Sequence, residues 1–150
     1  MAKARPSRGT TRRTATRKRS EKVGTFKYRI ELAASAEGPF RALDAMVDTG
    51  SIYTWVPETI LRELGLAPTD NIEFTMANGK PEYRDAVEAL MRLDGKLRHT
   101  ICVFGGEKDL TLLGAYALEG FGLAVDPVNK RLVRMPTIPA ASADDATRRC

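Results

Sequence analysis

The sequence predicts an all-β fold, a small closed β-barrel with one or two short helices. Short apolar runs recur along the chain at intervals of roughly 8–12 residues, which is typical of barrels and sandwiches. The turn-forming pairs Asn78-Gly79 and Asp94-Gly95 separate several of these runs. Only two short stretches have helical spacing, and no apolar run approaches the ~20 residues that a membrane helix needs. A chain of 150 residues is long enough for one domain with a substantial core.

The charge distribution divides the chain into three parts. Residues 1–22 hold nine Lys or Arg side chains and one Glu, a net +8, so the rest of the chain carries −3 of the total of +5. Because this segment has almost no apolar side chains, we expect a disordered basic tail at 1–22. A globular domain is expected at 23–135, and an Ala/Pro/Ser-rich flexible tail at 136–150.

The basic tail leaves two interpretations open. Residues 3–22 could attract nucleic acid or another polyanion, or they could be a solvated tail without a partner. The tail lacks the apolar region of a secretory signal, and two cysteines do not make a disulfide framework. We therefore expect a cytoplasmic protein without a membrane segment.

The first half of the domain reads as two strands, an extended segment and a short helix. Phe26 to Leu32 alternates apolar and polar residues, and a turn at 34–38 leads to a second strand at 40–48. The chain then extends through 52–56. Pro57 can begin a helix, because its missing N–H is not needed there, and Gly65 can end it.

The second half reads as further hairpins. Strands are expected at 72–76, 87–93, 97–103, 110–113, 123–126 and 131–135, with a second short helix at 115–119. Both positions of Asn78-Gly79 tolerate positive φ, so this pair predicts a tight hairpin turn. Pro81 then limits the returning strand to an edge or to a projecting hairpin. In the strand at 97–103 the alternating set is Leu97, His99, Ile101 and Val103.

The stretch from Ala45 to Ser51 contains the candidate catalytic residues. An apolar strand ends on Asp48, and a carboxylate in apolar surroundings is costly unless it is hydrogen-bonded or shares its charge. Gly50 allows close backbone approach, and the hydroxyls of Thr49 and Ser51 can donate hydrogen bonds. An ordinary turn with a solvated Asp is the alternative interpretation of these residues.

A second segment makes the pattern more specific. Asp48-Thr49-Gly50-Ser51 is followed about 60 residues later by Thr111-Leu112-Leu113-Gly114, and then by the stretch from Gly122 to Asp126. This combination resembles the retropepsin-like aspartic proteases, the single-domain relatives of the retroviral proteases. The resemblance covers roughly residues 26–135 and leaves out both tails.

The resemblance implies a role for each matching residue. Asp48, Thr49 and Gly50 would be the catalytic turn, with the Thr49 hydroxyl reaching across to a partner half. Thr54, Leu113 and Gly114 would support that turn from behind. The substrate-binding residues would be Ser51, Trp55 and, on a flap hairpin, Met76, Ala77, Asn78 and Gly79. Trp55 could equally be a core aromatic.

The expected chemistry requires an assembly. Peptide hydrolysis of this kind needs two carboxylates that share one proton, and the chain holds a single Asp-Thr-Gly. We therefore expect a homodimeric endopeptidase that acts on extended peptides or proteins, each copy being a half-site. No cofactor or metal is expected, since one histidine and two distant cysteines make no zinc site.

The sequence also departs from the retroviral pattern. Where retroviral members commonly carry an Asp and an Arg that brace the dimer, this chain has Ile52 and Ala115. The surfaces that form the dimer are therefore left open. Two other functions also stay open: a catalytically silent module for dimerisation or peptide binding, and a nucleic-acid-associated protein that acts through its basic tail.

Overall fold

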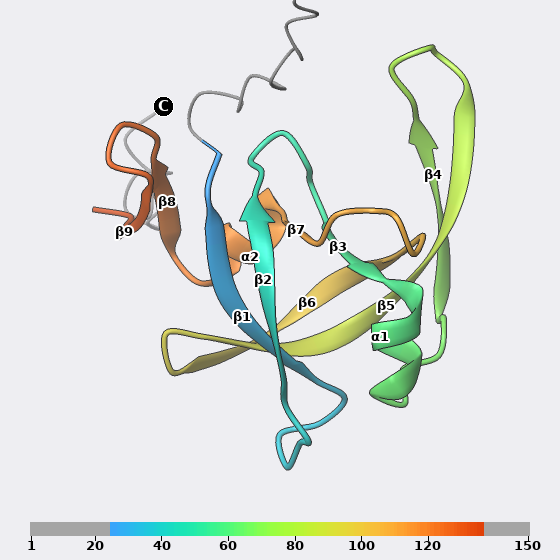
Figure 1. Ribbon diagram of the computed structural model, residues 1–150, viewed down its shortest axis with the longest axis horizontal. Helices are drawn as coiled ribbons and strands as arrows, with labels where there is room; N and C mark the ends of the chain where they lie inside the picture. Colours follow the sequence, from blue (N-terminus) through green and yellow to red (C-terminus); the bar gives the residue numbers. More distant parts are fainter. Residues whose placement is uncertain (1–24, 137–150) are drawn as a thin grey trace, which may run out of the picture.

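Within residues 25–136, which the computed structural model describes, the chain forms nine strands and two short helices (Figure 1). They are β1 (Lys27–Ala33), β2 (Arg41–Val47), β3 (Thr54–Pro57), α1 (Glu58–Glu63), β4 (Asp70–Thr75), β5 (Pro81–Leu93), β6 (Lys96–Gly105), β7 (Leu112–Leu113), α2 (Ala115–Gly120), β8 (Leu123–Asp126) and β9 (Arg131–Arg134). The two expected tails lie outside the described residues, except for Pro136.

Six of the strands close into a ring. Their order is β1-β2-β7-β3-β6-β5, and β5 pairs back with β1. The closing pairs are antiparallel, from Glu31 opposite Arg92 to Ala33 opposite Leu90. The predicted closed all-β barrel is confirmed, with both helices lying beside the strands rather than between them.

The first hairpin follows the predicted alternation. In β1 and β2, every second side chain enters the core, so Ile30, Leu32, Ala45 and Val47 are almost completely buried. The strands pair antiparallel, with Ile30 opposite Leu43. This register carries the chain directly into the Asp48 turn at the end of β2.

The long strand β5 belongs both to the ring and to a hairpin that projects from it. Its second half, from Ala86 onward, pairs with β6 inside the ring. Its first half pairs only with β4, from Thr75 opposite Pro81 to Asp70 opposite Ala86, and this pair projects from the ring as a hairpin (Figure 1). The position of Pro81 in that hairpin confirms the prediction, because no neighbour on its other side needs its missing N–H.

The turn of the projecting hairpin differs from the tight turn that Asn78-Gly79 predicted. Only Gly79 has a positive φ, +79°. The Gly79 N–H donates to the Met76 carbonyl at 2.8 Å, and the Met76 N–H donates to the Lys80 carbonyl at 2.9 Å. Asn78 instead uses its side-chain oxygen to accept from the Lys80 N–H at 2.9 Å. The Asn side chain thus satisfies the backbone locally, and the loop is longer than two residues.

The buried face of β6 is not the one that its apolar alternation suggested. Thr100, Cys102 and Phe104 point into the core, together with Val103. His99 is exposed, and its Nδ1 atom lies 3.1 Å from Glu88 Oε1. Of the predicted set only Val103 is fully buried, whereas Cys102, expected as a small core residue, and Thr100 occupy the inward positions.

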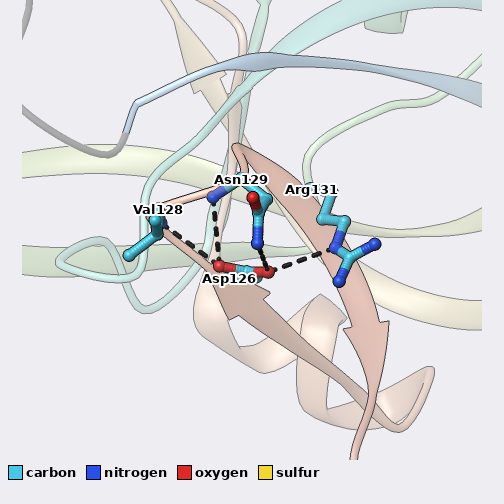
Figure 2. Close-up of polar contacts among 4 residues, drawn as sticks. All are labelled: Asp126, Val128, Asn129 and Arg131. Carbon is cyan, nitrogen blue, oxygen red and sulfur yellow. Dashed lines mark hydrogen bonds and ion pairs between the residues drawn. The ribbon is translucent and has the colours of Figure 1, made fainter.

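The hairpin β8–β9 forms a separate two-stranded sheet after α2. Its turn is organised by the Asp126 carboxylate, which accepts from the Val128 and Asn129 N–H groups and from the Asn129 and Arg131 side chains (Figure 2). Leu123, Val125 and Leu132 pack against the core. None of the described helices is long and apolar enough to span a membrane.

Candidate active site

The Asp48 turn begins where β2 leaves the core. Val47 is buried, whereas Asp48 is half-buried and Thr49 and Gly50 are exposed. The Gly50 N–H donates to Asp48 Oδ1 at 3.0 Å, and the Ser51 N–H donates to the Asp48 carbonyl at 3.2 Å. These bonds orient the carboxylate. Among the described residues no hydrogen bond engages the second oxygen, Oδ2, so it is free to act on another group.

Strand β7 holds this turn in place from behind. It lies between the two arms of the loop, parallel to β2 and antiparallel to β3. The Asp48 N–H donates to the Leu113 carbonyl at 3.0 Å, and Leu113 itself is completely buried. Beyond β7, the Ala115 N–H donates to the Ser51 carbonyl at 2.8 Å. The turn is therefore fixed by backbone bonds on both sides.

Behind the turn, the chain segment of Gly114 passes close to the segment of Thr54. The Gly114 N–H donates to Thr54 Oγ1 at 3.2 Å, and the Thr54 side chain is fully buried. A Cβ atom at position 114 would lie 2.4 Å from the Tyr53 carbonyl oxygen, closer than real contacts allow. The two chain segments can cross here because position 114 has no side chain. A Cβ at Gly50 would meet Asp48 Oδ1 at a less severe 3.1 Å.

Trp55 belongs to an aromatic cluster rather than to the deep core. Its ring is half-buried and lies 5.2 Å from the Phe74 ring, while the Arg84 guanidinium is 5.8 Å from its centre. Tyr53 extends the cluster, with ring centres 6.5 Å from Phe74 and 6.1 Å from Tyr116. These contacts connect the segment after Asp48 to the base of the projecting hairpin. The sequence predicted Trp55 as a site residue. It did not predict this cluster, because the members of the cluster are far apart in the chain.

The expected flap residues form a separate group. Met76, Ala77, Asn78 and Gly79 are all exposed at the tip of the projecting hairpin. Within residues 25–136 no hydrogen bond or ring contact joins this tip to the Asp48 turn. The Ser51 hydroxyl donates to the Tyr53 carbonyl at 2.8 Å, so it stabilises the loop in this structure.

No other aspartate of the described region completes the site. Each has its own partner elsewhere: Asp44 with Arg29, Asp70 with the Asn71 N–H, Asp85 with Asn71, Asp94 with Tyr28, Asp109 with Gly106, and Asp126 with the residues of its turn. Cys102 is no alternative nucleophile, because burial raises the pKa of its thiol to about 12 and keeps it protonated. The described residues thus present one oriented carboxylate, Asp48, with one oxygen that no hydrogen bond among them engages.

The comparisons with known proteins add a similarity to solved structures. No protein-family model matches the chain, and no curated protein matches it. Among solved structures, the chain is similar to the protease of simian foamy virus (mac), with 18% sequence identity and a TM-score of 0.47. The matched region covers 63% of this chain and 92% of that one. A likeness of this extent transfers no activity, so a function for this chain has to be argued from its own residues.

Proposed function

We propose that the chain is an aspartic endopeptidase that works as a homodimer, with Asp48 of each copy forming the catalytic pair. The observation that carries this proposal is the Asp48 carboxylate itself. One oxygen is held by the Gly50 N–H at 3.0 Å, and the backbone behind it is bonded to Leu113. Such bracing is what a carboxylate needs if it is to meet a second carboxylate in a fixed geometry.

The reaction follows from two carboxylates that share one proton. The ionised Asp48 accepts a proton from a water molecule, whose oxygen attacks the peptide carbonyl carbon. The protonated Asp48 donates its proton to the carbonyl oxygen, which gives a tetrahedral diol. The Asp48 that took the water proton then donates it to the leaving nitrogen as the C–N bond breaks, and the other Asp48 takes a proton from the diol, which becomes the carboxylic acid product. Neither carboxylate can do both tasks at once, so a single copy is inactive.

The projecting hairpin fits the role of a cover for the substrate. Its tip, with Met76 and Asn78, is exposed, and within residues 25–136 no hydrogen bond joins it to the Asp48 turn. Its base is anchored through Phe74 against Trp55. An extended peptide would lie between the Asp48 turn and this hairpin, gripped through its backbone, and closure of the hairpin would exclude water.

Replacing the catalytic carboxylate tests the proposal. Asp48→Asn should lower the rate of peptide cleavage by at least about 10²–10⁴-fold, since the amide cannot act as base or acid. The assay would use a mixed peptide library at about pH 4–6. Asp44→Asn is the matched control, because Asp44 is an exposed carboxylate in β2, the strand that leads into the Asp48 turn, and forms an ion pair with Arg29.

The outcomes separate peptidase from binding module. Retained cleavage by Asp48→Asn would remove Asp48 from the mechanism. If the wild-type protein binds extended peptides but cleaves none of them, the catalytically silent module becomes the better description. Cleavage that is lost in Asp48→Asn and kept in Asp44→Asn would support the peptidase.

A further inference from the structure

The β4–β5 hairpin needs support from outside its own sheet pairing. Within residues 25–136, β5 pairs with β6 only from Ala86 onward, and before that point it pairs with β4 alone (Figure 1). A two-stranded hairpin by itself is at best marginally stable in water. Contacts between side chains of the hairpin and the body of the barrel must therefore hold it in position.

One face of the hairpin provides these contacts. Four of its side chains are half-buried, namely Ile72, Phe74, Glu82 and Arg84. They share a face, because the first and last of them lie opposite each other across the strands, as do the other two. Tyr83, which points to the other face, is exposed. Two of the four side chains on the inner face are charged, which is uncommon for a packing surface.

Arg84 connects this face to two other elements. Its guanidinium carbon lies 5.8 Å from the centre of the Trp55 ring in β3, and its Nη1 atom lies 3.9 Å from Asp109 Oδ2 in the loop after β6. Glu82 of the hairpin pairs with the same guanidinium. Arg84 Nε is buried and has no hydrogen-bond partner among the described residues. The guanidinium thus lies between the hairpin and the body, with its inner edge shielded from solvent.

Both contacts of Arg84 in the body are themselves held in place. Asp109 Oδ2 accepts from the Gly106 N–H at 2.6 Å, and the Asp109 N–H donates to the Gly106 carbonyl at 3.0 Å. Trp55 is held by strand pairing on both sides, with β6 and with β7. Arg84 therefore joins the hairpin to two fixed points of the body.

We infer that Arg84 is the positioning residue that fixes the β4–β5 hairpin beside the candidate site. A planar guanidinium can lie against an aromatic ring and meet carboxylates at its edge at the same time, which the compact ammonium group of a lysine cannot reproduce. The position of the hairpin is argued from these contacts alone. Its use as a cover for a substrate rests on the function proposed above.

Amide hydrogen exchange measures how firmly the hairpin is held. The side chain in Arg84→Gln is uncharged and too short to reach Asp109, so the protected amides of residues 71–83 should exchange at least about tenfold faster than in the wild type. Arg84→Lys should restore only part of the protection. Glu82 and Asp109 lose a partner, but they are 35% and 43% exposed, so water can solvate them and the barrel should stay folded.

Arg62→Gln is the matched control. Arg62 also has a cation–π contact, 5.6 Å from the centre of the Phe104 ring, and an ion pair with Glu58, but it lies on α1. Its replacement should leave exchange in the hairpin within about twofold of the wild type. Equal acceleration of hairpin exchange by both variants would show a general loss of stability and would overturn the inference.

Trp55 gives a spectroscopic readout of the same contact. It is the single tryptophan of the chain, so the fluorescence of the protein reports on its surroundings. Arg84→Gln should raise the acrylamide quenching constant at least about twofold, because the guanidinium no longer covers the ring and the hairpin is less firmly held against it. Arg62→Gln should leave quenching unchanged. Equal quenching of the wild type and Arg84→Gln would contradict the inference.

Peptide kinetics separate the inference from the proposed function. If the wild type cleaves peptide, Arg84→Gln should raise KM at least about tenfold with a smaller effect on kcat, because the hairpin binds substrate and moves no proton. A loss confined to kcat would overturn the inference.

Two further outcomes distinguish the two claims. If Arg84→Gln accelerates hairpin exchange and raises Trp55 quenching while the wild type cleaves nothing, the positioning role stands and the peptidase fails. If hairpin exchange is the same in Arg84→Gln and in a wild type that cleaves peptide, the positioning role fails and the peptidase stands.

Discussion

At the scale of single residues, Gly114 is the most constrained position in the candidate site. A Cβ there would lie 2.4 Å from the Tyr53 carbonyl oxygen and 2.8 Å from that of Ile52, and both contacts are with backbone. Gly114→Ala should therefore lower the free energy of unfolding by about 1–3 kcal/mol, because the two segments must separate. It should also displace the Asp48 turn and reduce cleavage. Urea unfolding and the peptide assay would measure the two effects.

Gly120→Ala provides the control for that substitution. Gly120 is the last residue of α2, and a Cβ there would meet nothing within 4 Å. Alanine favours the helix over glycine by up to about 1 kcal/mol, so this variant should be neutral or slightly more stable. A Gly114→Ala protein with wild-type stability would contradict the close approach of the backbone at Gly114 to the carbonyls of Ile52 and Tyr53.

Residue types in the sequence identified the turn better than they identified its surroundings. Asp48 and Gly50 were expected in one turn, and the bond between them can be reached from local spacing because a short loop allows few partners. The bond of Thr54 to Gly114 spans 60 residues, and the supporting role of Thr54 was expected only from the resemblance. The packing of Tyr53 and Trp55 against Phe74 was not expected. Aromatic contacts between elements about 20 residues apart depend on strand register and side-chain rotamers, which periodicity does not specify.

At the scale of elements, periodicity located the strands but not always the face that each one buries. In β1 and β2 the apolar residues alternate cleanly, so the prediction was right. In β6 the inward residue Thr100 carried no apolar signal, although it is almost fully buried, whereas Cys102 lies in the core as expected. The Asn78-Gly79 pair predicted a hairpin correctly, yet the turn itself was different because the Asn78 side chain bonds to the Lys80 N–H.

The β8–β9 turn should have its own pH dependence. Hydrogen bonds from the Asn129 side chain and backbone, followed by the Arg131 guanidinium, lower the pKa of Asp126 from 3.8 to about 2. Because the pKa is lower in the folded protein, the carboxylate contributes stability at pH values above about 3.8, and this contribution is lost as pH falls from there toward 2. A ¹³C NMR titration of the Asp126 carboxyl group should give a midpoint near 2.

The Asn129 side chain is the largest contributor, and this can be tested separately. Asn129→Ala should raise the midpoint of Asp126 further than Arg131→Gln does, since the amide outweighs the guanidinium. The backbone N–H bonds of Val128 and Asn129 remain in both variants. A wild-type midpoint at the ordinary value of 3.8 would show that the turn does not hold Asp126 in the way that Figure 2 shows.

At the scale of the whole molecule, the ring of strands fixes the position of the Asp48 turn. β7 enters between β2 and β3, and the β1–β5 pairing closes the ring behind them. The Asp48 turn is left at the surface, and among the described residues only the Gly50 N–H bonds to its carboxylate. Ring closure joins residues about 60 positions apart, so local patterns predicted the barrel as a class but not which strands would meet.

Subunit mixing tests the half-site directly. When inactive Asp48→Asn protein is added in equal amount to wild-type protein and the subunits exchange, half of the wild-type copies acquire an inactive partner. Cleavage per wild-type copy should then fall to about half, because both carboxylates must be intact. If an excess of Asp48→Asn protein leaves cleavage unchanged while isotopically labelled subunits demonstrably exchange, one Asp48 would be sufficient and the paired mechanism would be wrong.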